Sequence, residues 1–155
     1  MLEIEKRTMF EMESDPKFRL LLAEYALEIE KNRGPKPCAD IEMYYRMEKS
    51  GIFHAWAAYL NGAMIGLISV IANIFPHYSL PMASTESWFV EVEHRKTGAG
   101  MKLLAIAKEY VEKIGSHGLI ISAPINGPLI KVLENSDDYM EMGKVFFARL
   151  NHARS

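Results

Sequence analysis

The stretch that decides the fold is Val90-Glu91-Val92-Glu93-His94-Arg95-Lys96-Thr97-Gly98-Ala99-Gly100-Met101, where an apolar segment passes into a helical one through two glycines. Residues 84–92 predict a strand, and residues 100–115 carry apolar side chains at helical spacing. A strand that enters a helix through such a turn points backbone N–H groups into one concavity, at the positive end of the helix dipole. We therefore expect an anion such as a pyrophosphate to bind there, with Arg95 and Lys96 supplying countercharge.

The glycine pair leaves a second interpretation open. Gly98 and Gly100 equally suit a tight strand-to-helix turn that binds nothing. A dinucleotide fingerprint and a Walker loop are excluded, because the third glycine of the first and the Gly-Lys-Ser/Thr of the second are missing. The segment is thus either an anion site or a plain turn.

On either side of this stretch, residues typical of helix ends and turns predict where the other elements begin and end. Ser14-Asp15-Pro16 predicts the cap of a first helix over residues 16–31, and Asp40 precedes a shorter one over 41–49. Asn61-Gly62 joins two apolar runs into a β-hairpin. The hairpin strands are expected at 53–60 and 63–71, and an irregular loop follows at 73–81. Further along the chain we expect a strand at 119–122, a weak helix at 126–133 and a last strand at 144–150. A poorly marked first strand is expected at 2–7.

Composition predicts one globular domain over residues 1–155, because 49% of the residues are hydrophobic and no repeat or linker interrupts the chain. The net charge of −2 makes nucleic acid an unlikely partner, since it supplies no long-range positive field. The single cysteine, Cys38, cannot form an internal disulfide, and the N-terminus lacks a signal-peptide pattern. We therefore expect a cytoplasmic protein, and no apolar run approaches the roughly 20 residues that span a membrane.

The loop and the order of elements resemble the GNAT superfamily of N-acetyltransferases. Arg95-x-x-Gly98-x-Gly100 matches the family's coenzyme loop, Arg/Gln-x-x-Gly-x-Gly/Ala. The resemblance implies an α/β (α+β) fold, with a mixed central sheet that is mostly antiparallel in its N-terminal half and has helices on both faces. It also implies transfer of an acetyl group from acetyl-coenzyme A to an amine, directly in a ternary complex. Residues 75–79, 85–90, 121–124 and 145–147 resemble the short members that phages and prophages encode.

The family's coenzyme contacts transfer to matching positions. The backbones of Val90 and Val92 would pair with the pantetheine arm like an added strand, and Asn126 would face that arm. Val92 stands where many members have proline. The amides that would hold the pyrophosphate belong to Lys96, Thr97, Gly98, Ala99, Gly100 and Met101.

The resemblance also implies catalytic roles. Glu86 is the candidate general base, although a solvated strand carboxylate explains it equally well, and the N–H near Val90 would be the oxyanion donor. Many members carry a tyrosine as general acid, at a position that matches Leu133 in this chain. Ser122 and Tyr139 are the candidate substitutes, and a coenzyme thiolate also leaves without a dedicated acid.

The sequence also bears on metals, on the acceptor and on self-association. The five histidines are scattered without ligand spacing, so we expect no metal. The acceptor would be an amine on a small molecule or a protein. Leu20 and Leu27 lie off the main apolar stripe of the first helix and indicate either a homodimer contact or a buried second face. The alternatives to an enzyme are a non-catalytic coenzyme-binding or partner-binding module of the same fold, and an unrelated phosphate-binding α/β module.

Overall fold

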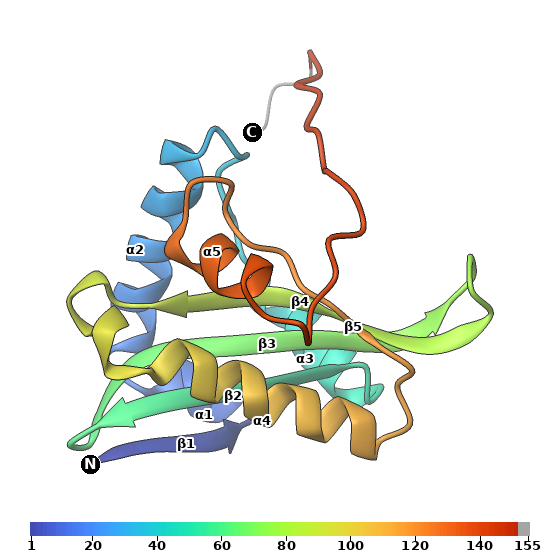
Figure 1. Cartoon of the computed structure of the whole chain (residues 1–155). Coiled ribbons are helices and arrows are strands. Elements are labelled where there is room, and N and C mark those ends of the chain that lie inside the picture. The colour runs from blue at the N-terminus through green and yellow to red at the C-terminus, as the bar shows by residue number, and fades with distance from the viewer. Residues whose placement is uncertain (152–155) are drawn as a thin grey trace.

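A five-stranded sheet in the order β1-β2-β3-β4-β5 organises the chain, which a computed structural model describes for residues 1–151 (Figure 1). The first four strands are antiparallel, and β5 pairs with β4 in parallel, at Ala83↔Leu119 and Ser84↔Ile120. This confirms the expected mixed, mostly antiparallel sheet. The strands are β1 (Leu2–Arg7), β2 (Phe53–Leu60), β3 (Ala63–Phe75), β4 (Leu80–Val90) and β5 (Leu119–Ile120).

Helices cover both faces of the sheet (Figure 1). One face carries α1 (Met9–Ser14), α2 (Phe18–Lys31) and α3 (Ile41–Lys49). The other carries α4 (Ala99–Lys113) and α5 (Pro128–Glu134), with the 3-10 helix η1 (Val92–Thr97) leading from β4 into α4. No helix within residues 1–151 is long and apolar enough to cross a bilayer.

The central strands separate two cores. On β2, Phe53 and Tyr59 pack towards α1–α3, whereas Trp56 packs towards α4. Leu103 and Leu104 of α4 have no exposed surface, and burying each contributes about 1.5–3 kcal/mol. Because the strands are buried on both faces, they appear in the sequence as continuous apolar runs rather than as an alternating pattern.

The N-terminal part differs from the sequence-based expectation. Residues 2–7 do form a strand, but α1 follows it and was not predicted. Thr8 caps α1, because the Glu11 N–H donates to its Oγ1 at 3.2 Å while Glu11 Oε2 accepts from the Thr8 N–H at 2.8 Å. Pro16 therefore lies in a turn between two helices, and α2 begins at Phe18 rather than at residue 16.

The expectation of an irregular loop at 73–81 is wrong. Strand β3 continues to Phe75 and β4 begins at Leu80, so the two form one long hairpin that projects from the sheet (Figure 1). Its turn contains Pro76, and Ser79 takes the left-handed conformation there, with φ 52°. Pro81 is tolerated in the strand because it precedes the pairing with β5, which begins at Ala83.

The expected last strand at 144–150 is also wrong within the described residues. That stretch is extended but has no strand assignment, and its side chains are exposed. The expected strand at 84–92 ends at Val90, so Val92 belongs to η1. Leu20 and Leu27 are 61% and 58% exposed, which excludes the buried second face, one of the two interpretations of these leucines.

Candidate active site

The junction between β4 and α4 exposes backbone N–H groups at a helix start. Gly98, at φ 82° and ψ 2°, turns η1 into α4 in a left-handed conformation that disfavours any side chain. The first intrahelical bond runs from the Lys102 N–H to the Gly98 carbonyl, at 3.1 Å. The Ala99 N–H points to Thr97 Oγ1 at 3.3 Å, so the N–H groups of Gly100 and Met101 are the ones that the helix geometry leaves for a ligand.

Arg95 fastens this loop to the body of the protein. Its Nε donates to the Val90 carbonyl at 3.0 Å, and its guanidinium pairs with the Glu28 carboxylate of α2. The guanidinium also lies 5.4 Å from the centroid of the Phe89 ring. Arg95 was expected to be a countercharge for an anion, but its side chain points to α2, and Lys96 is the exposed cation of the pair.

The buried Glu91 carboxylate also holds the loop between β4 and α4 in place, through contacts with the start of α2 and with η1. Glu91 is only 5% exposed and accepts from the Lys17 ammonium at 2.7 Å. This contact raises the pKa of Lys17, because the hydrogen bond to Glu91 stabilises the ammonium. The His94 Nε2 lies 3.4 Å from the second Glu91 oxygen. Glu91, Glu93 and His94 form a group whose ligand-type atoms lie within 4.8 Å of one another, which the sequence did not suggest.

Close packing sets the distance between the helix start and the sheet. Trp88 Nε1 donates to the Gly100 carbonyl at 3.1 Å. In the neighbouring strand β3, Gly66 pairs with Val90, and a Cβ at Gly66 would lie 2.8 Å from the Phe89 carbonyl oxygen. Only glycine allows β3 to approach β4 this closely.

Strands β4 and β5 diverge directly after their two paired positions. The Ser122 N–H donates to the Thr85 hydroxyl at 3.0 Å, and within residues 1–151 no strand pairs with the backbone of β4 on this side from Thr85 to Val90. Asn126 is an exposed residue that follows β5 along the chain and lies just before α5. An extended ligand arm can add to such an edge.

Glu86 lies at a β-bulge on the edge-forming part of β4. Ser69 pairs with Ser87 and Val70 with Thr85, so Glu86 is the additional residue on its strand. The bulge places Glu86 and Ser87 on the same face, towards α2 and α3. This is the irregularity that no sequence rule predicts.

Three hydroxyls hold the Glu86 carboxylate. The Tyr44 hydroxyl donates to Oε1 at 2.6 Å, while Ser69 and Ser87 donate to Oε2 at 2.7 and 2.6 Å. Burial and the hydrogen bond to Glu86 raise the pKa of Tyr44 well above its usual value, so its hydroxyl remains a proton donor. Burial and the same carboxylate also raise the pKa of Tyr25. Ser69 and Tyr44 were missed as partners because β3 and α3 supply them from distant parts of the chain.

A small hollow of about 40 Å³ lies beside Glu86 between the sheet and the first three helices. It is lined by Met9, Met12, Phe18, Leu22, Ala39, Ile41, Tyr44, Phe53, Leu67, Ser69, Glu86 and Ser87. The carboxylate therefore faces a mostly apolar environment.

The two candidate general acids lie elsewhere. The Tyr139 hydroxyl accepts from Lys108 Nζ at 3.3 Å, and its ring packs on the α4 side of the sheet. Leu133 packs on the same core. Ser122 is an exposed residue following β5. Glu86, by contrast, faces the α2–α3 side, so the structure brings neither hydroxyl into contact with it.

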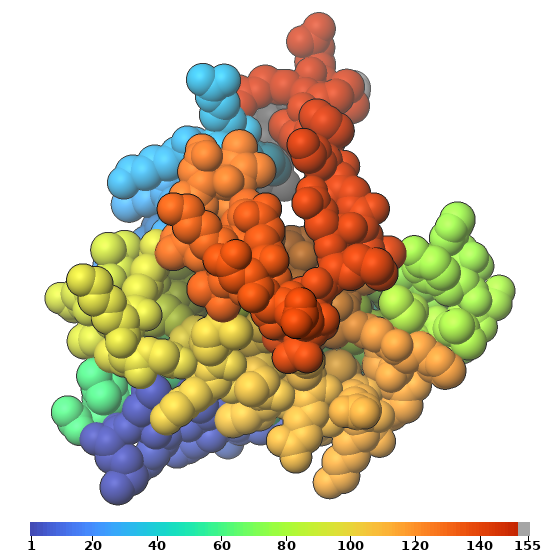
Figure 2. Space-filling model, viewed as in Figure 1, coloured from blue at the N-terminus to red at the C-terminus, as the bar shows by residue number. Residues whose placement is uncertain are grey.

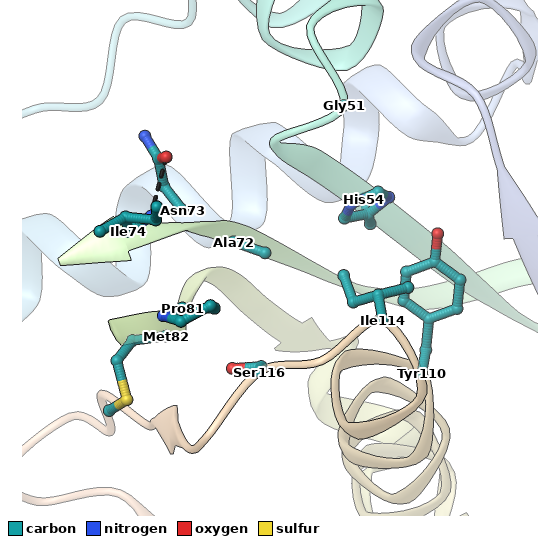
Figure 3. A pocket seen from close by; sticks show the side chains of 10 residues that line it. All are labelled: Gly51, His54, Ala72, Asn73, Ile74, Pro81, Met82, Tyr110, Ile114 and Ser116. Atoms are coloured by element: carbon teal, nitrogen blue, oxygen red, sulfur yellow. Dashed lines mark hydrogen bonds between the residues drawn. The ribbon is translucent and has the colours of Figure 1, made fainter. Parts of the chain in front are cut away.

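A larger hollow of about 410 Å³ lies at the opposite end of α4 from the loop between β4 and α4 (Figure 3). His54 of β2 and Tyr110 of α4 line it, with ring centroids 4.8 Å apart, together with Ile114. Burial and the nearby Lys6 ammonium lower the pKa of His54. The hollow shares no lining residue with the loop or with Glu86.

Comparison with known proteins agrees with this geometry. The profile of the acetyltransferase (GNAT) family matches residues 6–135. No curated protein sequence matches the chain.

Three solved structures illustrate the shared fold. An aminoglycoside acetyltransferase from an uncultured soil metagenomic sample is 18% identical, with a TM-score of 0.73 and 97% of each chain covered. The ribosomal-protein-alanine N-acetyltransferase of Brucella melitensis biovar Abortus 2308 is 17% identical, with a TM-score of 0.69 and coverage of 96% of this chain and 99% of that one. The aminoglycoside N-acetyltransferase AAC(6')-Iy, solved with a bisubstrate analogue, is 15% identical, with a TM-score of 0.73 and coverage of 98% and 99%.

Proposed function

Because the chain belongs to the acetyltransferase (GNAT) family, we propose that it is an N-acetyltransferase that transfers the acetyl group of acetyl-coenzyme A directly to an amine. The observation that carries the proposal is the juxtaposition around β4. At the C-terminal end of β4 lies the start of α4, whose first N–H groups remain available for a ligand. At the bulge of β4 lies the Glu86 carboxylate, which three hydroxyls hold.

The residues at the junction fit a pyrophosphate-bearing substrate. The amides of Gly100 and Met101 would hold the pyrophosphate, with Lys96 as countercharge. The free edge of β4 up to Val90 would pair with the pantetheine arm, opposite Asn126. Val92 is 67% exposed in η1, so we retain only Val90 as a strand-like partner. The bound thioester supplies the activated acetyl group.

Glu86 would accept the proton of the attacking ammonium. A carboxylate has about four acceptor positions, and three are taken by Tyr44, Ser69 and Ser87. One position therefore remains for the amine, and the three hydroxyls fix its direction. The Val90 N–H remains our proposed oxyanion donor, and Ser122 and Tyr139 remain candidates for protonating the thiolate.

The acceptor would be an amine on a small molecule or on a protein. Structural neighbours include an aminoglycoside acetyltransferase solved with sisomicin and the ribosomal-protein-alanine acetyltransferase. The fold accommodates both classes, and acceptor choice depends on loops. A cytoplasmic location and kinship with phage-encoded members remain predictions from the sequence.

Calorimetric titration with acetyl-coenzyme A and with free coenzyme A tests the proposal without the acceptor. We expect micromolar binding of both, followed by thiol release when sisomicin or an alanine-terminated peptide is added. Binding without turnover across a wide panel of amines favours the non-catalytic module. An absence of binding by a folded protein would refute the coenzyme site.

A further inference from the structure

The segment that leads from β4 into α4 brings together three side chains of the kinds that bind metal ions. Glu91, Glu93 and His94 offer two carboxylates and one imidazole, and their ligand-type atoms lie within 4.8 Å of one another. Among residues 1–151 no second group of three or more histidine, cysteine, aspartate or glutamate side chains meets this spacing. A single histidine gives no ligand spacing in the sequence, so only the folded chain reveals the group.

The conformation of η1 explains the grouping. A 3-10 helix has three residues per turn, so side chains three positions apart lie above one another. Glu91 is the N-cap residue of η1, and the His94 N–H donates to the Glu91 carbonyl at 2.9 Å. Glu93 precedes His94 directly, and its Oε1 lies 3.6 Å from His94 Nε2. The turn thus brings both carboxylates next to the imidazole.

Glu91 supplies the observation that points to a ligand. Its side chain is only 6% exposed, and one of its oxygens, Oε1, accepts from Lys17 Nζ at 2.7 Å. The other oxygen, Oε2, is buried, and no group in residues 1–151 donates a hydrogen bond to it, although His94 Nε2 lies 3.4 Å away. A buried charged oxygen without a partner is costly to a fold. A cation between this oxygen and the imidazole nitrogen would remove that cost.

The separations between these atoms suit zinc. A zinc ion lies about 2.0–2.2 Å from imidazole nitrogen and carboxylate oxygen, so tetrahedral ligands are about 3.3–3.6 Å apart. The distances from His94 Nε2 to Glu91 Oε2 and to Glu93 Oε1 are 3.4 and 3.6 Å. Magnesium and calcium prefer a larger set of oxygen ligands, whereas an imidazole with carboxylates is a typical zinc environment. The group therefore fits zinc better than either of those ions.

We propose that Glu91, Glu93 and His94 bind one Zn²⁺ ion, with water as the fourth ligand. Three protein ligands and one open position are a common arrangement around zinc. The ion would join the residue that follows β4 to the first turn of η1, and so hold the segment that leads into α4. The acetyl transfer proposed above needs no metal, so the site is additional to that activity and does not depend on it.

The site is open to solvent on one side. Side-chain exposure rises from 6% at Glu91 to 28% at His94 and 78% at Glu93. Figure 2 shows the yellow segment that contains η1 at the surface of the molecule. An ion can therefore bind Glu93 first and reach the buried Glu91 oxygen from there.

Charge at the site favours a dication. Glu91 and Glu93 carry two negative charges, and the Lys17 ammonium offsets one of them. The Arg95 guanidinium, which follows in η1, is paired with Glu28 of α2. A positive ion is therefore attracted to the Glu91 oxygen without a partner and to the exposed Glu93 carboxylate.

Calorimetric titration with zinc chloride tests the site, on full chain that has been treated with EDTA, dialysed and kept free of coenzyme. Every protein tested carries Cys38→Ser, because Cys38 is an exposed thiol that would also bind zinc. We expect one ion per chain with a micromolar Kd, and binding at least about 10-fold weaker in His94→Gln and in Glu93→Gln. His77→Gln is the matched control, because His77 is exposed in the turn between β3 and β4 and should leave zinc affinity unchanged.

Thermal unfolding supplies a second readout. An ion that binds only the folded chain raises its melting temperature. We expect zinc to raise the Tm of the parent and of His77→Gln, but not that of His94→Gln, and we expect the same concentration of magnesium to raise none of them. An absence of zinc binding by the folded parent, equal affinity in the parent and both ligand variants, or an equal rise in Tm with magnesium would each overturn the proposal.

Discussion

Arg95 Nε donates a hydrogen bond to the carbonyl oxygen of Val90, at 3.0 Å. The sequence predicts a countercharge role for Arg95 and an oxyanion-donor role for the Val90 N–H. In the structure the Arg95 side chain instead joins the Val90 carbonyl, at the end of β4, to the Glu28 carboxylate of α2. Arg95 thus holds the loop against β4 and α2 in this chain, and Lys96 is the exposed cation beside it.

This arrangement separates the effects of two adjacent cations. Arg95→Met should lower both stability, by about 1.5–3 kcal/mol, and coenzyme affinity, because partly buried hydrogen bonds of a charged group are lost. Lys96→Met should weaken coenzyme binding with no change in stability, since its side chain is exposed. Urea unfolding and calorimetric titration of both variants provide the comparison. Equal stability losses in the two variants would contradict it.

The start of α4 should reject a negative charge but accept a methyl group. Gly100→Glu is expected to abolish coenzyme binding, because bulk and charge enter the amide site. A Cβ at Gly100 meets only ordinary contacts, 3.7 Å from Val90 Cγ2 and 3.9 Å from Trp88 Nε1, so Gly100→Ala should fold and bind. Titration of both variants, with circular dichroism to verify folding, decides the point. Binding by a folded Gly100→Glu variant removes the basis of the anion site.

Glu86 should affect turnover rather than coenzyme affinity. Glu86→Gln is expected to lower kcat by about 10²–10⁴-fold and to alter the pH–rate profile, as loss of a general base does. Tyr44→Phe should give a smaller loss, because two hydroxyls still hold the carboxylate. Glu93→Gln serves as the control, since Glu93 is exposed on η1. A pH–rate profile unchanged in Glu86→Gln would exclude Glu86 as the base.

Gly66 should tolerate no side chain. A Cβ there lies 2.8 Å from the Phe89 carbonyl and 3.1 Å from Val90 Cα, so Gly66→Ala must push β4 away and should destabilise the fold by about 1–3 kcal/mol. At Gly118 the nearest atom is the Met82 Cε, at 3.1 Å, which is the mobile end of a flexible side chain. Gly118→Ala should therefore change the free energy of unfolding much less. Similar losses in denaturant titrations would disprove the difference.

His54 should make stability depend on acidity. Burial first, and Lys6 second, lower its pKa from 6.5 in the folded state, so the unfolded chain binds the proton more readily. The stabilising contribution is complete above pH 6.5 and is lost as the pH falls through the lower folded value. His54→Phe keeps a ring beside Tyr110 and should reduce the fall in unfolding free energy between about pH 7.5 and pH 5. Denaturant titrations at both pH values measure this fall, and His77→Phe, at an exposed histidine, is the control variant.

Local sequence signals predicted most of the secondary structure that positions the site. The Asn61-Gly62 turn, the apolar stripe of α4 and the glycines of the loop each act within a few residues, so they could be interpreted without the fold. The helix α1 shows the limit of such reasoning, because the capping box of Thr8 and Glu11 was present in the sequence but was overlooked beside the stronger proline signal at Pro16.

The remaining features depend on distant parts of the chain. The bulge at Glu86 arises from the register between β3 and β4, and Tyr44 reaches its carboxylate from α3. Residues 144–150 have the composition of a strand but no neighbour in the described chain, which no local pattern can reveal. Likewise, the length of β5 depends on where β4 diverges rather than on its own apolar run.

The two-residue pairing of β4 with β5 has a consequence for the speed of substrate entry. The strands already diverge after Ser84 and Ile120, so the edge of β4 is exposed before any ligand binds. No hydrogen bond between β4 and β5 has to break first. Association should therefore proceed in one kinetic phase, with a rate that rises linearly with coenzyme concentration and shows no plateau from a preceding opening step.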